Sequence, residues 1–79
     1  MIILALTELE QFQLIESAFR DGLYEVAASQ LEEFIKNYPE SEYLDRAMVL
    51  LGRCYMETKD YDRAQHIFME FLMWRNQMV

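Results

Sequence analysis

The chain repeats itself with an offset of 37 residues, and this internal repeat limits the possible fold more than any other feature. Moving 37 positions from Ala27 leads to Ala64, and the residues around the two alanines then agree in type. The matched pairs are Tyr24 with Tyr61, Leu31 with Phe68, Phe34 with Phe71, Ile35 with Leu72, and Leu14 with Leu51. A repeat of this length is typical of stacked supersecondary units, each of which buries its apolar face against a neighbour.

The first repeat contains the signals of two helices. The run Thr7-Glu8-Leu9-Glu10 has the pattern of a capping box, and apolar residues at helical spacing follow it to about Arg20. Gly22 suits the left-handed position that follows a helix end. A second periodic segment runs from Tyr24 to about Tyr38, and Pro39 ends it because proline disfavours the helical region for the residue before it.

The second repeat has the same organisation. Ser41 is expected to cap a third helix that ends at about Glu57, and Asp60 is expected to cap a fourth. No segment alternates with a period of two for long enough to indicate a strand. Four helices with short connections predict an all-α protein made of two antiparallel helical hairpins.

The residues at the repeated positions resemble the tetratricopeptide repeat (TPR) family. The second repeat carries Leu51-Gly52-x-x-Tyr55, then Asp60-Tyr61, Ala64 and Phe68; the first carries Leu14, Ala18, Gly22, Tyr24, Ala27, Leu31 and Pro39. Residues 37–64 are similar to the longer repeats of bacterial envelope proteins, such as the outer-membrane assembly lipoproteins and the Tol–Pal coordinating protein. The resemblance implies a single domain over residues 1–79, a TPR-like right-handed solenoid fragment. Repeat one then covers about residues 8–39 and repeat two about 41–76.

The charge balance excludes several classes of partner. Asp and Glu number 14 against 7 Lys and Arg, which gives a net charge of −7. This balance argues against nucleic acid, since no basic patch is available to displace counterions from phosphates. The apolar start, residues 1–6, is too short to span a bilayer, so no membrane insertion is expected. As a signal peptide it is incomplete, and the alternative is that it forms the tail of one whose start lies upstream. A single cysteine, Cys54, suits the cytoplasm and the bacterial periplasm, and both remain open.

Little in the sequence points to catalysis or to a metal. His66 is the only histidine and is expected to pair with Asp62, one turn before it on the same helix. Cys54 is expected to pack in the core. No nucleophile motif, phosphate-binding loop or paired metal-ligand motif is present. We therefore expect no enzymatic activity, no cofactor and no metal site.

The resemblance implies that the first helix of each hairpin lines a groove that binds a protein or peptide partner. Mapped through the repeat, the expected groove residues are Phe12, Glu16, Arg20, Arg46, Val49, Arg53 and Met56. The arginines would act as charged anchors and the apolar residues as the floor. The alternative is that Phe12, Phe19 and Val49 belong simply to the core.

The last helix is the second candidate surface. Its apolar residues Ile67, Phe71, Met73, Trp74 and Met78 are expected to be uncovered. A patch of that kind usually marks an interface. The sequence therefore predicts a protein-interaction module that forms a homo-oligomer or belongs to a longer array. The alternative function is a structural scaffold or assembly subunit with no peptide ligand.

Overall fold

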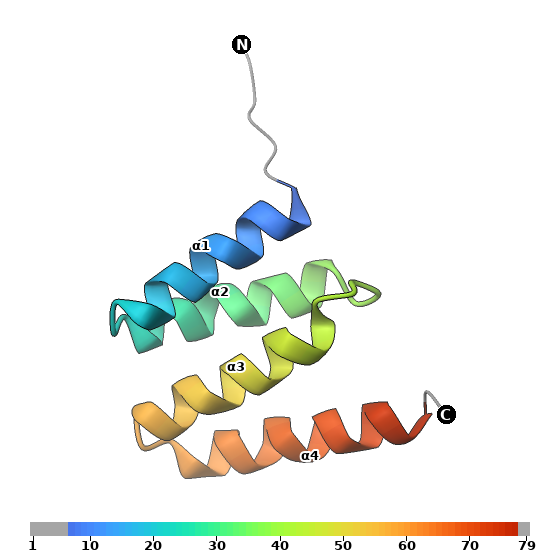
Figure 1. Ribbon diagram of the computed structural model, residues 1–79. Helices are drawn as coiled ribbons and strands as arrows, with labels where there is room; N and C mark the ends of the chain where they lie inside the picture. The colour runs from blue at the N-terminus through green and yellow to red at the C-terminus, as the bar shows by residue number, and fades with distance from the viewer. Residues whose placement is uncertain (1–6, 78–79) are drawn as a thin grey trace.

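The structure, a computed structural model, describes residues 7–77 and consists of four helices stacked in the order of the sequence (Figure 1). The helices are α1 (Glu8–Arg20), α2 (Tyr24–Asn37), α3 (Leu44–Glu57) and α4 (Tyr61–Gln77). Residues 7–77 contain no strand, so the predicted all-α fold of stacked hairpins is confirmed. The apolar start, residues 1–6, and Met78 lie outside the described residues.

The first helix begins and ends where the sequence predicts. The Thr7 hydroxyl accepts a hydrogen bond from the Glu10 amide at 3.1 Å, and the Glu10 carboxylate accepts one from the Thr7 amide at 3.0 Å. These bonds complete the capping box and lower the pKa of Glu10. Gly22 follows the helix with a φ of 81°, and the Leu23 amide donates back to the Ala18 carbonyl at 3.0 Å. This backward bond satisfies a carbonyl that the end of the helix leaves free.

The third helix begins later than predicted, and Ser41 does not cap it. The Ser41 hydroxyl instead accepts a hydrogen bond from the Tyr43 amide at 3.1 Å, only two residues on. The Ser41 carbonyl accepts from the Leu44 amide, also at 3.1 Å. The serine is therefore used within the turn that follows Pro39, and α3 starts at Leu44.

The turns within the two hairpins are built alike. Lys59, 37 positions after Gly22, also has a left-handed backbone, with a φ of 63°. The Asp60 amide donates to the Tyr55 carbonyl at 2.8 Å, the same five-residue backward bond that closes the first turn. Asp60 also caps α4 as predicted, because its carboxylate accepts a hydrogen bond from the Arg63 amide at 3.4 Å.

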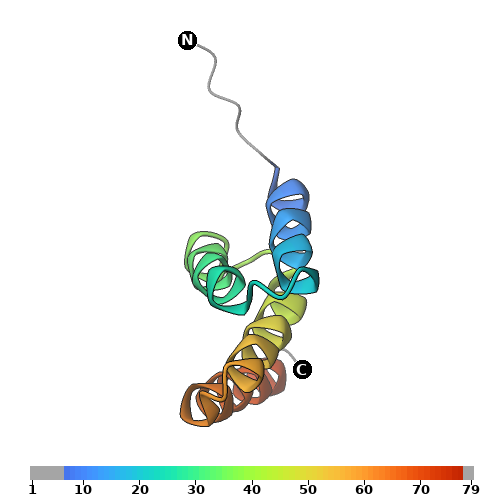
Figure 2. The same ribbon diagram turned by 90° about the vertical axis from the view of Figure 1, so that its left-hand side faces the viewer.

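Each helix packs against the next one along the chain, and the core runs through the middle of the stack. Figure 2 shows α1 and α2 side by side, with the second hairpin continuing from them. Ala27 and Ala64 are completely or almost completely buried, so small side chains lie where the helices of each hairpin approach closely. Of residues 7–77, no helix is long and apolar enough to cross a membrane.

Candidate protein-interaction groove

A hollow of about 370 Å³ lies where α1, α3 and α4 come together. Three of its lining residues are arginines: Arg46 and Arg53 on α3 and Arg75 on α4. We call it the arginine hollow. The lining also includes two carboxylates, Glu16 on α1 and Asp45 on α3, so three arginines face two acidic side chains in a chain that is acidic as a whole.

Arg46 is held by both a carboxylate and a ring. One of its guanidinium nitrogens lies 3.0 Å from a carboxylate oxygen of Glu16, across the gap between α3 and α1. The same guanidinium group lies over the Phe12 ring, 5.1 Å from its centroid. The ion pair is largely exposed, so it contributes less than about 1 kcal/mol to stability. Its main consequence is that Glu16 neutralises Arg46.

Arg53 and Arg75 are held by aromatic rings alone. Arg53 lies over the Phe19 ring, 4.9 Å from its centroid, and Arg75 lies over the Phe71 ring at 5.6 Å. Among residues 7–77, neither arginine forms an ion pair. A cation–π contact fixes a guanidinium group without using its N–H donors. These two arginines therefore form no direct ion pair within the described chain, and the Asp45 carboxylate is the acidic group that lines the hollow with them besides Glu16.

The structure brings five of the seven predicted groove residues to the arginine hollow, namely Phe12, Glu16, Arg46, Val49 and Arg53. Arg20 and Met56 do not line it; both are exposed at the far ends of their helices. The alternative interpretation of Phe12 is also correct in part, since this side chain belongs to the buried core while its ring supports Arg46.

The contribution of α4 to this hollow is not among the sequence-based predictions. Phe71 is predicted to mediate self-association and Arg75 has no predicted role, but both side chains line the arginine hollow. Their spacing of four residues places them on one side of a helix. That spacing was the available signal, but it does not say which side of α4 faces α3.

The residues predicted for self-association do not form one exposed patch. Ile67 is only 7% exposed, so the prediction that it is uncovered is wrong. Ile67 belongs to the buried core cluster, and Ile35 on α2, which is half-buried against that core, lines a hollow beside it together with Leu51. Phe71 and Trp74 are half-buried against the core, whereas Met73 is 61% exposed.

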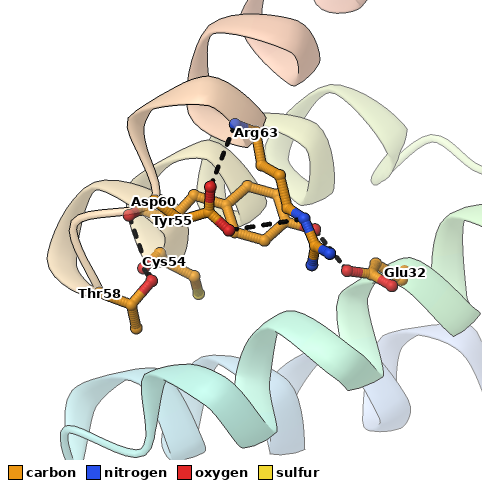
Figure 3. A network of polar contacts seen from close by, with 6 residues as sticks. All are labelled: Glu32, Cys54, Tyr55, Thr58, Asp60 and Arg63. Atoms are coloured by element: carbon orange, nitrogen blue, oxygen red, sulfur yellow. Dashed lines mark hydrogen bonds and ion pairs between the residues drawn. The ribbon is translucent and has the colours of Figure 1, made fainter.

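A polar network on α2, α3 and α4 joins the two hairpins (Figure 3). The Tyr55 hydroxyl on α3 donates a hydrogen bond to the Glu32 carboxylate on α2. Arg63 on α4 lies over the Tyr55 ring, 6.0 Å from its centroid, and its Nε is 3.4 Å from a carboxylate oxygen of Asp60. Burial raises the pKa of Tyr55 to about 12, and the hydrogen bond to Glu32 adds to this effect.

Cys54 lies in the core, as predicted, one helix position before Tyr55. Its side chain is inaccessible, and burial raises the pKa of its thiol to about 11. A thiol is nucleophilic only as the thiolate, so this environment suits packing and not catalysis.

The remaining candidates for chemistry are dispersed over the surface. His66 pairs with Glu70, one turn after it, at 2.9 Å, so the predicted pairing with Asp62 is wrong. Within residues 7–77, no three His, Cys, Asp or Glu side chains are grouped so that they can hold a metal ion.

The repeated hairpins and the matched left-handed turns define a TPR-like helical-repeat protein. Residues 5–77 match the YfiO family, described as outer membrane lipoprotein. The match covers nearly the whole sequence, so the chain belongs to this family, and the predicted likeness to TPR-type envelope lipoproteins is confirmed. Comparisons with curated proteins and with solved structures gave no match.

Proposed function

We propose that this chain is a non-catalytic protein-interaction module that binds an acidic, partly apolar segment of a partner in the arginine hollow. Membership of the YfiO family supports a role in protein interaction or assembly at the bacterial envelope. The arginine hollow is the part of the described surface best suited to that role.

The observation that carries the proposal is the pair of arginines without carboxylate partners. Arg53 and Arg75 are held over Phe19 and Phe71, so their positions are fixed before any ligand arrives. Preorganised side chains lose little conformational entropy on binding. The planar guanidinium group also matches a carboxylate with two parallel hydrogen bonds.

The apolar part of the lining sets the second requirement on the ligand. Val49 and Leu50 on α3 are partly exposed in the hollow, between the arginines. An aliphatic side chain of a bound segment can cover them and remove apolar area from water. A segment in which Asp or Glu alternates with Leu, Val or Phe therefore fits better than a uniformly acidic one.

Direct binding of short peptides tests this proposal. Peptides that combine acidic and aliphatic residues are titrated into the protein, and isothermal titration calorimetry measures their affinity. The same peptides with Asn and Gln in place of Asp and Glu are the neutral control ligands. A hydrogen-bonded charge pair is worth about 1.5–3 kcal/mol, so we expect a loss of at least about tenfold in affinity for the neutral peptides.

Substitutions of the arginines test whether the peptides bind in the arginine hollow. The double substitution Arg53→Gln and Arg75→Gln should weaken binding of the acidic peptides by at least about tenfold and reduce its dependence on salt. Arg63→Gln is the control for Arg53→Gln, because Arg63 is also exposed but lies at the Tyr55 network, away from the hollow. Equal affinity for acidic and neutral peptides, or equal losses in the Arg63 and Arg53 variants, would contradict the proposal.

A further inference from the structure

The contact between the two hairpins shows how one repeat packs on the next. Ile35, near the end of α2, lines a hollow of the second hairpin together with Leu51 on α3 and Ile67 on α4. Because the sequence repeats with an offset of 37, each of these three residues has a counterpart in the other repeat. The counterparts of the α3 and α4 residues lie 37 positions earlier, on the first hairpin, and the counterpart of Ile35 lies 37 positions later, on α4. These positions are at the two ends of the stack.

One end of the stack carries a similar hollow that no counterpart of Ile35 lines. The counterparts of Leu51, Ile67 and His66 are Leu14, Gln30 and Ser29, and all three line a hollow of about 290 Å³ on the outer face of α1 and α2. Leu14 is 58% exposed there, whereas Leu51 is buried in the joint. Among residues 7–77, none takes the place that Ile35 has in the second hairpin.

The opposite end carries the counterpart of Ile35 on an exposed face of α4. The counterpart of Ile35 is Leu72 on α4, which is 59% exposed. Met69 and Met73 lie three residues before it and one after it, and both are also more than half exposed. Residues 69, 72 and 73 share one side of a helix, so α4 presents an apolar stripe on its outer side.

The hydrogen-bonded pair of the internal joint is replaced by apolar residues at the two ends of the stack. In the joint, Glu32 accepts a hydrogen bond from Tyr55. The counterpart of Glu32 is Met69, and the counterpart of Tyr55 is Ala18. A carboxylate facing Ala18 would be buried without a donor, whereas a methionine facing it is compatible with burial. At this pair of positions the two ends therefore match in polarity.

We infer that copies of this chain stack head to tail, with Leu72 of one copy in the hollow beside Leu14 of the next. The occupant is a second copy because this chain carries both halves of the joint. The contact is heterologous, since the two faces that meet are different. After each copy is added, the hollow at one end of the assembly and the apolar stripe at the other are still free. The assembly therefore lengthens along one axis as the protein concentration rises.

Two single substitutions distinguish this arrangement from a two-fold dimer. Leu14→Gln blocks the hollow, and Leu72→Gln blocks the stripe; both positions are exposed, so the fold of each copy is retained. By sedimentation velocity over an about hundredfold range of concentration, we expect the wild-type chain to grow beyond the dimer and each variant alone to stay monomeric. An equimolar mixture of the two variants should form a 1:1 dimer and nothing larger, because only one intact joint is available.

Each other outcome overturns the inference. A Leu14→Gln variant that dimerises by itself would mean that α4 pairs with α4 of a second copy. A wild-type chain that stays monomeric, or an equimolar mixture that does not associate, would mean that the two ends do not meet. Leu23→Gln is the matched control, because Leu23 is equally exposed but lies in the α1–α2 turn; it should assemble like the wild type. None of these residues lines the arginine hollow, so this inference and the proposed function fail independently.

Discussion

The ring of Phe68 on α4 occupies the space where a Cβ atom of residue 52 on α3 would lie. Gly52 is therefore required by close approach and not by an unusual backbone conformation, since it lies within a helix. The contact fixes how closely the second hairpin can close. In the first hairpin the counterparts of Gly52 and Phe68 are Ile15 and Leu31. The same position between the two helices of a hairpin is therefore occupied by a different pair of side chains in each repeat.

We expect Gly52→Ala to destabilise the protein by about 1–3 kcal/mol, because the new methyl group must displace the Phe68 ring. In a Phe68→Ala background the sign should reverse. Alanine is a better helix former than glycine by about 1 kcal/mol, and no ring then opposes it. Urea unfolding of the four proteins of this double-mutant cycle measures both effects. An unchanged sign in the Phe68→Ala background would mean that Gly52 is retained for another reason.

The hydrogen bond from Tyr55 to Glu32 makes the joint between the hairpins sensitive to alkaline pH. Burial raises the pKa of Tyr55 from 10.0 to about 12 in the folded state. The unfolded chain therefore releases this proton first as the pH rises. The stability that the neutral hydroxyl contributes is present in full below about pH 10 and is lost between about pH 10 and pH 12.

Tyr55→Phe should remove this part of the pH dependence. We expect the wild-type protein to lose more unfolding free energy than the variant between about pH 9 and about pH 11, measured by urea unfolding at each pH. The comparison with the variant cancels the titration of the other tyrosines. Parallel losses in both proteins would show that the Tyr55 hydroxyl titrates normally in the folded state.

The buried thiol of Cys54 should resist alkylation. Its pKa of about 11 leaves very little thiolate near neutral pH, and its side chain is inaccessible. We expect iodoacetamide to modify the native protein at least about a hundredfold more slowly than the protein in guanidinium chloride, since reaction requires opening of the fold. Mass spectrometry of timed samples measures both rates. Equal rates would mean that the core around Cys54 opens readily.

The capping box of α1 should weaken in acid. The bonds with Thr7 lower the pKa of Glu10, so the folded state favours the carboxylate. The contribution of Glu10 is then present above its ordinary pKa of 4.5 and is lost as the pH falls through the lower value of the folded state. Thr7→Ala should reduce helix content at neutral pH and flatten this acid response, as measured by circular dichroism. A Ser17→Ala variant, on the same helix but outside the box, is the control.

The parts of the fold that depend on local chemistry were predictable from the sequence. Thr7, Gly22, Pro39 and Asp60 each act through neighbouring backbone groups, and each has the predicted role. Ser41 was not predictable in the same way, because its hydroxyl has two amides within reach and bonds the one inside the turn. His66 poses a similar choice, since Asp62 and Glu70 lie four residues to either side of it.

The candidate site was predictable only where the repeat places residues on α1 and α3. Phe71 and Arg75 enter the arginine hollow because of the way α4 crosses α3, which the helical period does not specify. The burial of Ile67 likewise depends on how the helices pack in the core, which its position on α4 does not specify. Errors of this kind arise where one hairpin meets the other, and the sequence of a single helix does not contain that information.

The packing of each helix against the next has a consequence for how the chain folds. Most contacts join residues that are close in sequence, so little loop-closure entropy is lost before the first stable contacts form. Helical proteins with such local contacts fold within microseconds to milliseconds. Either hairpin can therefore act as the nucleus, and the second can condense on it through the Ile35 and Tyr55 joint. A chain that emerges slowly from a ribosome, or through a translocation pore, leaves the apolar face of its first hairpin exposed until the second is available.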